Sequence, residues 1–148
     1  AIPTTTAALE IFNNGSRQLV VSDLFASHIL ATAIVQVHAI YAQITTKKAV
    51  PTLTALAQNS LCGKGALTPT AESEVVTGVG TTVVANGWRP WGGLQNFNLA
   101  AATPGESWDV AVDGKLVVPP NSSLCLHIVG SLATASSFQV GCDFDLVD

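Results

Sequence analysis

The stretch from Trp108 to Asp148 constrains the fold most, because short apolar runs alternate there with strong turn signals. Four β-like runs occur in it, and Asp113-Gly114 and Pro119–Ser123 separate the first three. An Asp-Gly pair between alternating apolar runs predicts a tight hairpin, since glycine accepts the positive φ that the turn needs. No helical pattern connects the runs, so the predicted strands pair antiparallel.

Alternation along the last two runs assigns one face of each predicted strand to a core. These faces carry Leu124, Leu126, Ile128, Val140, Cys142 and Phe144. Asp143 and Asp145 fall on the opposite face of the last strand, where they meet solvent or another subunit.

The N-terminal part also has strand-like runs separated by turn signals. A first strand is expected over Thr4–Phe12, followed by a hairpin turn at Asn13–Ser16 and a partner strand over Arg17–Ser22. The segment Asp23–Leu30 fits a short helical turn and a bent strand equally well. The β-branched residues of Ala31–Thr45 predict a long central strand, with a helix as the alternative.

Strand-like runs at intervals of roughly 8 to 14 residues, separated by Gly, Pro and Asn, are typical of an all-β sandwich or barrel. About eight to ten antiparallel strands are expected, the number that a jelly roll needs. The 148 residues contain no repeat or linker. Residues 1–148 are therefore expected to form a single jelly-roll-like β-sandwich domain, with residues 1–6 as an extended N-terminal arm that pairs with a neighbour's sheet edge.

Charge is scarce in this sequence. Charged residues make up 11% of the chain and apolar residues 48%, whereas typical soluble domains are about 25% charged. Such a neutral surface is easily buried against other subunits, because little charge must be desolvated. The six Lys and Arg residues are scattered, so no nucleic-acid partner is expected. No apolar run reaches the roughly 20 residues of a membrane span, so no membrane partner is expected either.

The cysteines and histidines form no recognisable catalytic or zinc-binding pattern. Cys62, Cys125 and Cys142 are odd in number and lack CxxC spacing, which argues against a disulfide framework. A Cys125–Cys142 bridge between neighbouring strands is an open alternative. His38 and His127 lie mid-strand, as sheet-face histidines do, and no serine occupies a nucleophile turn. We therefore expect a protein that is not an enzyme and needs no cofactor.

Closely spaced carboxylates are the other candidate chemistry, since such pairs can catalyse glycoside hydrolysis or bind a hard cation. The pairs are Glu72 with Glu74, Asp109 with Asp113, and Asp143 with Asp145. The chain has no Asx-rich calcium loop, so no metal site is expected. Asp143 and Asp145 are instead interpreted as a solvated or subunit-facing edge of the last strand.

The segment Asn86–Gly93 has the most unusual local composition. Trp88 and Trp91 stand three residues apart, with Arg89 between them. Exposed indoles stack on sugars, and Trp and Arg dominate the energetics of protein interfaces. The alternative is that both rings fold back and close one end of the sandwich. Trp88, Arg89 and Trp91 join Asp143 and Asp145 as candidate contacts with a partner or a glycan.

The run Asp113-Gly-Lys-Leu-Val-Val-Pro-Pro-Asn-Ser-Ser-Leu-Cys-Leu-His-Ile-Val-Gly130, followed by a small-residue loop and an acidic last strand, resembles small structural proteins of tailed bacteriophages. In that family a Gly-Lys-Ile-Val-Val-Pro-Pro-Gly-Ser turn precedes an apolar strand. Here Asn121 replaces the commoner Gly, and Asp143-Phe144-Asp145 replaces an ending of the Trp-Glu-Glu type. The N-terminal Asn13–Val21 run is also similar to that group.

The resemblance implies a jelly-roll subunit on a virion, often a trimer, that acts as a capsid decoration (cement) protein or as part of a fibre or knob. It carries over no catalytic residue. The expected protein is thus a virion homo-oligomer, assembled in the host cytoplasm, that contacts the major capsid protein or another virion protein. The alternative function is a carbohydrate-binding β-sandwich module or the receptor-binding part of a phage fibre.

Overall fold

The computed structural model describes residues 5–31, 37–46, 58–59, 66–67, 75–78, 83–95, 107–130 and 136–148. Nearly all of these residues are β-structure, which confirms the all-β class. The elements are β1 Leu9–Asn13, β2 Gln18–Ala31, β3 Val37–Thr46, β4 Gln58–Asn59, β5 Ala66–Leu67, β6 Val75–Gly78, the 3-10 turn η1 Ala85–Gly87, β7 Arg89–Gln95, β8 Ser107–Val118, β9 Ser122–Gly130 and β10 Ser136–Val147. Within this described part, no helix has the length and apolar character to cross a membrane.

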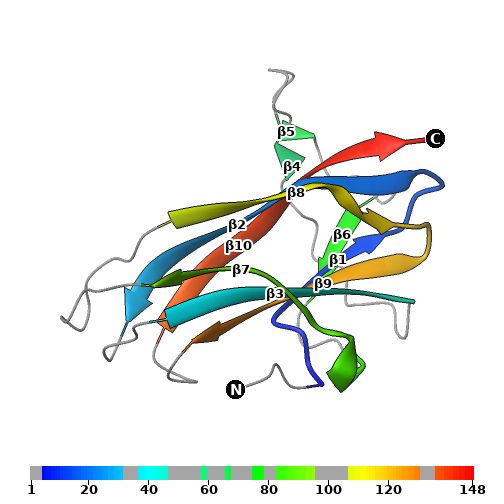
Figure 1. The fold of residues 1–148 in the computed structure, drawn as a ribbon. Helices are drawn as coiled ribbons and strands as arrows, with labels where there is room; N and C mark the ends of the chain where they lie inside the picture. Colours follow the sequence, from blue (N-terminus) through cyan, green and yellow to red (C-terminus); the bar gives the residue numbers. More distant parts are fainter. Residues whose placement is uncertain are drawn as a thin grey trace.

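Two antiparallel sheets face each other and form a β-sandwich (Figure 1). The five-stranded sheet has the order β6-β1-β9-β3-β7, and the three-stranded sheet has the order β10-β2-β8. Strands β4 and β5 pair as a separate two-stranded ribbon. The sandwich that the strand pattern predicts is therefore confirmed. The jelly roll stays a prediction, because it requires Greek-key connections that run through residues 47–82, most of which are outside the described ranges.

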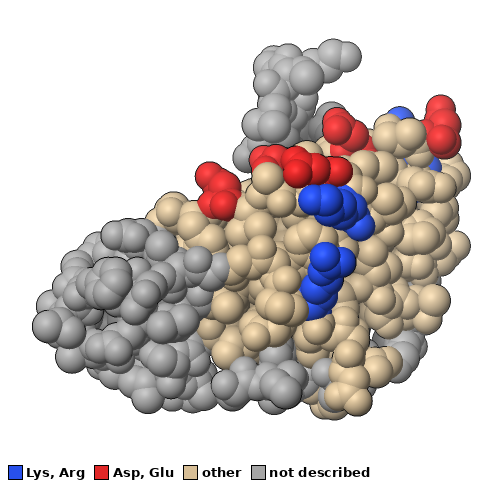
Figure 2. All heavy atoms as spheres, in the orientation of Figure 1, with Lys and Arg blue, Asp and Glu red and all other residues tan. Residues whose placement is uncertain are grey.

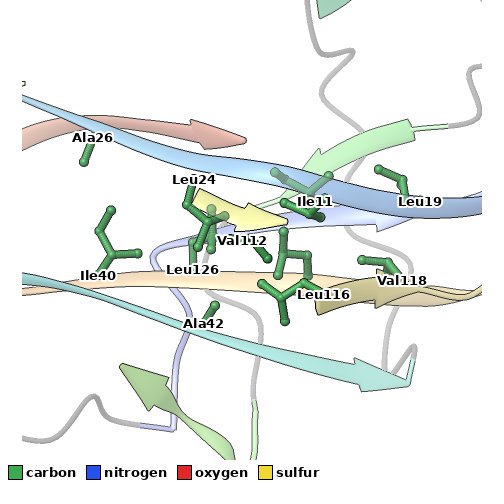
Figure 3. Packing of buried hydrophobic residues seen from close by; sticks show 12 residues of the cluster. Ile11, Leu19, Leu24, Ala26, Ile40, Ala42, Val112, Leu116, Val118 and Leu126 are labelled. Carbon is green, nitrogen blue, oxygen red and sulfur yellow. The ribbon is translucent and has the colours of Figure 1, made fainter. Parts of the chain in front are cut away.

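Buried aliphatic side chains from both sheets meet in the space between them (Figure 3). Each fully buried leucine contributes roughly 1.5–3 kcal/mol of transfer free energy. The buried cluster consists of Ile11, Leu19, Val21, Leu24, Ala26, Ile40, Ala42, Val112, Leu116, Val118, Leu124 and Leu126. The core residues predicted on β9 and β10 belong to it or pack against it, since Ile128, Val140, Cys142 and Phe144 contact the cluster.

The turn at Asn13–Ser16 does not form the predicted hairpin. Its flanking strands lie in different sheets: β1 pairs with β6 and β9, whereas β2 pairs with β8 and β10. The turn after β8 crosses between the sheets in the same way, since β8 pairs with β2 and β9 pairs with β1 and β3. Two crossings therefore lie side by side at one end of the sandwich.

Asn13 holds these two crossings together. Its side chain is completely buried, and its Nδ2 donates to the carbonyl oxygens of Arg17 at 2.7 Å and Val118 at 2.9 Å. Its Oδ1 accepts from the Gly15 N–H at 3.1 Å, and its own carbonyl accepts from the Asn121 N–H at 2.9 Å. The crossing at Asn121 has φ 58° at that residue, a conformation that Gly and Asn tolerate best.

Asp113-Gly114 is not a hairpin either, because β8 continues through it. Both halves of β8 pair with β2, and the register jumps between Val21–Leu116 and Asp23–Ala111. Between these two pairs β8 has more residues than β2, and the extra residues form a bulge. Asp113 (φ 53°) and Gly114 (φ 71°) lie in this bulge with positive φ values. The Asp-Gly pair therefore has the predicted backbone conformation, but it forms a bulge inside one long strand and not a hairpin turn.

The structure also tests the predictions for Asp23–Leu30 and for Ala31–Thr45. Asp23–Leu30 is a strand, since β2 runs unbroken from Gln18 to Ala31 and bulges at Ser22. Of the predicted long strand over Ala31–Thr45, residues 37–45 belong to β3 and Ala31 is the last residue of β2. Residues 32–36 are outside the described ranges, as are residues 1–4 of the expected N-terminal arm.

Candidate functional site

Trp88 packs on the outer face of the five-stranded sheet, the face turned away from the core. It follows η1 and contacts a small cluster of Ala7, Val83 and Cys125. Its ring lies 5.8 Å from the ring of His127, tilted by 60°. The indole is half-buried and covers part of this outer face.

Trp91 lies on the opposite side of the same sheet. It packs against the main core, and its Nε1 is buried with no hydrogen-bond partner among the described residues. Arg89 is exposed, and its guanidinium carbon lies 4.6 Å from the centre of the Trp91 ring, which is cation–π geometry. Trp88 and Trp91 therefore do not form one stacking platform, and the geometry gives no particular support to the glycan alternative.

Asp143 and Asp145 lie far from these rings in the fold, on β10 of the other sheet. Asp143 is paired with Asp23 across the strands, and Asp145 is paired with Val20. The Asp143 carbonyl oxygen accepts from Ser22 Oγ at 3.2 Å, beside the bulge of β2. Like charges directly opposite each other do not stabilise a strand pair, so the Asp23–Asp143 pair adds no favourable cross-strand contact.

Acidic residues gather on the three-stranded sheet. Asp23, Asp109, Asp113, Asp143 and Asp145 all belong to its strands. Figure 2 shows acidic atoms along the upper margin of the molecule, above a face that is mostly uncharged. Within the described ranges, no three His, Cys, Asp or Glu side chains come together in a way that could hold a metal ion. Glu72, Glu74 and Cys62 are outside those ranges.

A row of buried polar groups crosses the outer face of the five-stranded sheet, and no local pattern in the sequence indicates it. Glu10 is 2% exposed and accepts a short hydrogen bond from Ser123 Oγ. Gln43 donates from Nε2 to the Val84 carbonyl at 3.2 Å. Strand alternation places these groups on one face, but it does not reveal that Gln43 contacts the segment around Val84 and Gly87.

The two described cysteines are free thiols that do not meet. Cys125 lies on the outer face of β9, and Cys142 packs against the core from β10, so the Cys125–Cys142 bridge is not formed. Burial, and then the charge of Glu10, raises the pKa of Cys125 to about 12. Burial, and then the charge of Asp143, raises the pKa of Cys142 to about 12. Both are protonated near neutral pH and are therefore poor nucleophiles.

An apolar slot of about 400 Å³ opens between β9 and β10, next to the start of β1. Its lining residues are Ala8, Leu9, Leu126, His127, Ile128, Phe138 and Val140. Phe138 forms a firm wall, because its ring stacks on His28 at 4.9 Å and meets Trp108 edge-on at 6.0 Å. No sequence pattern indicates this slot, since it depends on where β1 leaves the sheet.

The three-stranded sheet has two open edges in the part of the chain that the structure describes. Strands β8 and β10 are both 12 residues long, and each pairs only with β2. The unpaired N–H and C=O groups of such an edge can pair with another strand.

Comparison with models of known protein families, with curated proteins and with solved structures finds no match.

Proposed function

We propose that this chain is a non-enzymatic structural subunit that self-associates and decorates a virion. The observation that supports this most is the pair of long open edges on the three-stranded sheet. Natural proteins usually protect long edges with charge, proline or a covering segment. Here β8 and β10 carry aspartates, and β8 has a bulge, but among the described residues no segment covers either edge of 12 residues, so both edges are available for pairing with a neighbouring subunit.

The scarcity of charge supports the same proposal. Only 11% of the residues are charged, and the face in Figure 2 is mostly neutral. Burying such a surface between subunits requires little desolvation of charge, which is the main penalty of polar interfaces. Apolar area buried in this way gains roughly 25 cal/mol per Å², before the entropy of association is subtracted.

The virion setting comes from the resemblance of Asp113–Gly130 to small structural proteins of tailed bacteriophages. By that resemblance the subunit is a homotrimer that binds the major capsid protein and stabilises the shell as a cement protein. A place in a fibre or knob is the nearest variant of the same proposal.

Light scattering on the purified protein tests self-association, and heating of capsids with and without the added protein tests the decoration role. We expect an oligomer and more heat-resistant capsids. Gln139→Lys puts a charge on the open strand β10, and Gln18→Lys is its matched control on the central strand β2, since both glutamines are exposed. Gln139→Lys should weaken the oligomer and Gln18→Lys should not. A strictly monomeric protein that leaves capsid stability unchanged would overturn the proposal.

A further inference from the structure

Strand β9 loses its neighbour on one side part-way along its length. Strand β1 begins at Leu9, opposite Leu126, and the Ala8 N–H donates to the Leu126 carbonyl at 3.1 Å. Before that point the chain lies over the outer face. The Thr5 carbonyl accepts from the Val83 N–H at 2.8 Å, and the backbone of Thr6 hydrogen-bonds with His127. No described strand occupies the position beside residues 128–130 on this side.

The apolar slot lies at this open strand position. Leu126 and Ile128 line it from β9, and Phe138 and Val140 line it from β10. Because side chains alternate along a strand, a strand added beside β9 would send every second side chain into the slot. An open edge next to an apolar pocket is the arrangement by which sheets recognise extended peptides: the backbone supplies affinity and the pocket supplies specificity.

The slot fits an uncharged segment with one large apolar side chain. None of its lining residues is Asp, Glu, Lys or Arg. Burial lowers the pKa of His127, although its hydrogen bond to Thr6 partly opposes this, so the imidazole is neutral near pH 7. A volume of about 400 Å³ lies at the small end of the range for ligand pockets, about 300–1,000 Å³.

We propose that the slot receives an extended strand from a second copy of the chain, contributed by the residues that precede Thr5. Ala1-Ile-Pro-Thr4 has one large apolar side chain, Ile2, between small uncharged residues. Ala8 lines the slot and lies three residues from Thr5. A symmetric contact that covers the slot therefore also brings the neighbour's preceding residues close to it. The inference rests on the proposed self-association and adds this slot to the open edges of β8 and β10 as a site of contact between subunits.

The donor side is tested first with Ile2→Glu in the full chain, a change that touches no described contact. We expect the Ile2→Glu oligomer to dissociate at a protein concentration about tenfold higher than the concentration at which the wild-type oligomer dissociates. Light scattering across a dilution series measures this concentration. The receiving side is tested with Val140→Trp, which fills the slot. Val117→Trp is its control, because Val117 is also half-buried but does not line the slot.

A labelled peptide that copies residues 1–6 provides a readout that does not need the oligomer. Fluorescence anisotropy should show this peptide binding to the Ile2→Glu protein and to its Val117→Trp form, with a loss of about tenfold or more in the Val140→Trp form. The same peptide with Glu in place of Ile2 should not bind.

The outcomes separate the two proposals. An oligomer unaffected by Ile2→Glu and Val140→Trp overturns the slot assignment and leaves self-association intact. A monomeric wild type contradicts the proposed function, and peptide binding at the slot then still supports strand capture. A peptide that binds no form, or binds equally with Ile or Glu, overturns the slot assignment.

Discussion

Asn13 is the residue on which the junction between the two sheets depends most. Asn13→Ala removes both Nδ2 hydrogen bonds and leaves the carbonyl of Val118 buried without that donor. An unsatisfied buried group costs about 1–3 kcal/mol, so we expect the free energy of unfolding to fall by about that amount. Urea denaturation followed by fluorescence measures it.

The neighbouring asparagine gives the control for this prediction. Asn14 is exposed, and surface substitutions usually change stability by no more than about 0.5 kcal/mol. Equal losses for Asn13→Ala and Asn14→Ala would mean that the turn as a whole, and not the buried amide, stabilises the junction.

The buried thiols predict how stability depends on pH. An unfolded cysteine has a pKa of about 8.5, whereas Cys125 and Cys142 have pKa values of about 12 in the fold. As pH rises, the unfolded state therefore loses these protons first, and the free energy of unfolding falls between about pH 8.5 and about pH 12. Denaturation midpoints across this range measure the fall.

The double variant Cys125→Ala and Cys142→Ala should lose less stability over the same pH range than the wild type. In addition, iodoacetamide should label both thiols far more slowly in the folded protein at about pH 8 than in urea. Mass spectrometry assigns the labelled sites. Labelling at the unfolded rate would show that these thiols are accessible.

At the scale of single residues, sequence patterns predicted the candidate contacts only in part. Alternation placed Asp143 and Asp145 opposite the core face of the last strand, and both do lie on β10 across from the residues that pack inward. Trp88 and Trp91 were candidate contacts with a partner or a glycan, but the chain enters β7 between them and sends the rings to opposite sides of the sheet. The buried Glu10 is hydrogen-bonded to Ser123, which lies 113 positions away in sequence, and no local pattern records this contact.

At the scale of strands, local turn chemistry was a better guide to conformation than to connectivity. Gly114 and Asp113 adopt the positive φ that the Asp-Gly pair indicated, and Asn13–Ser16 does form a turn. Whether such a turn returns into the same sheet, bulges or crosses to the other sheet depends on which distant strands are available to pair. β2 pairs with β8 and β10, whose partner residues lie 80 to 129 positions away in sequence, and not with the neighbouring strand β1.

Strand β7 lies close to β8 of the other sheet at Gly92. A methyl group on Gly92 would lie 2.7 Å from Val110 Cγ2. Because Val110 packs against the core, it has little room to move, and overpacking of this kind costs about 1–3 kcal/mol. We expect Gly92→Ala to lower the free energy of unfolding by that amount.

A double-mutant cycle separates the clash from other effects of the substitution. Val110→Ala removes the atom that the new methyl group meets, so Gly92→Ala should be less damaging in the Val110→Ala background. If the losses in free energy of unfolding from the two substitutions were additive, the effect of Gly92→Ala would not come from its contact with Val110.

At the scale of the whole molecule, the neutral surface predicts how assembly responds to salt. The net charge is −4 over 148 residues, and the described acids lie mainly on one sheet. Salt screens exposed charges strongly between about 0.1 M and about 1 M but leaves apolar contacts in place. We expect the oligomer mass, measured by light scattering, to stay constant over this range. Dissociation at high salt would point to an interface held by ion pairs.

The position of β10 in the three-stranded sheet has a consequence for the order in which this chain folds. β2 pairs along its whole length with β10, whose residues are synthesised long after those of β2. A fold dominated by contacts between residues so far apart closes large loops, and it acquires its native structure slowly. While β10 is still being synthesised, β2 has a bare side and the core lacks Phe144 and its neighbours. The same late step that completes the core also covers the bare side of β2 and makes β10 the edge of this sheet, so that edge exists only once the last strand is in place.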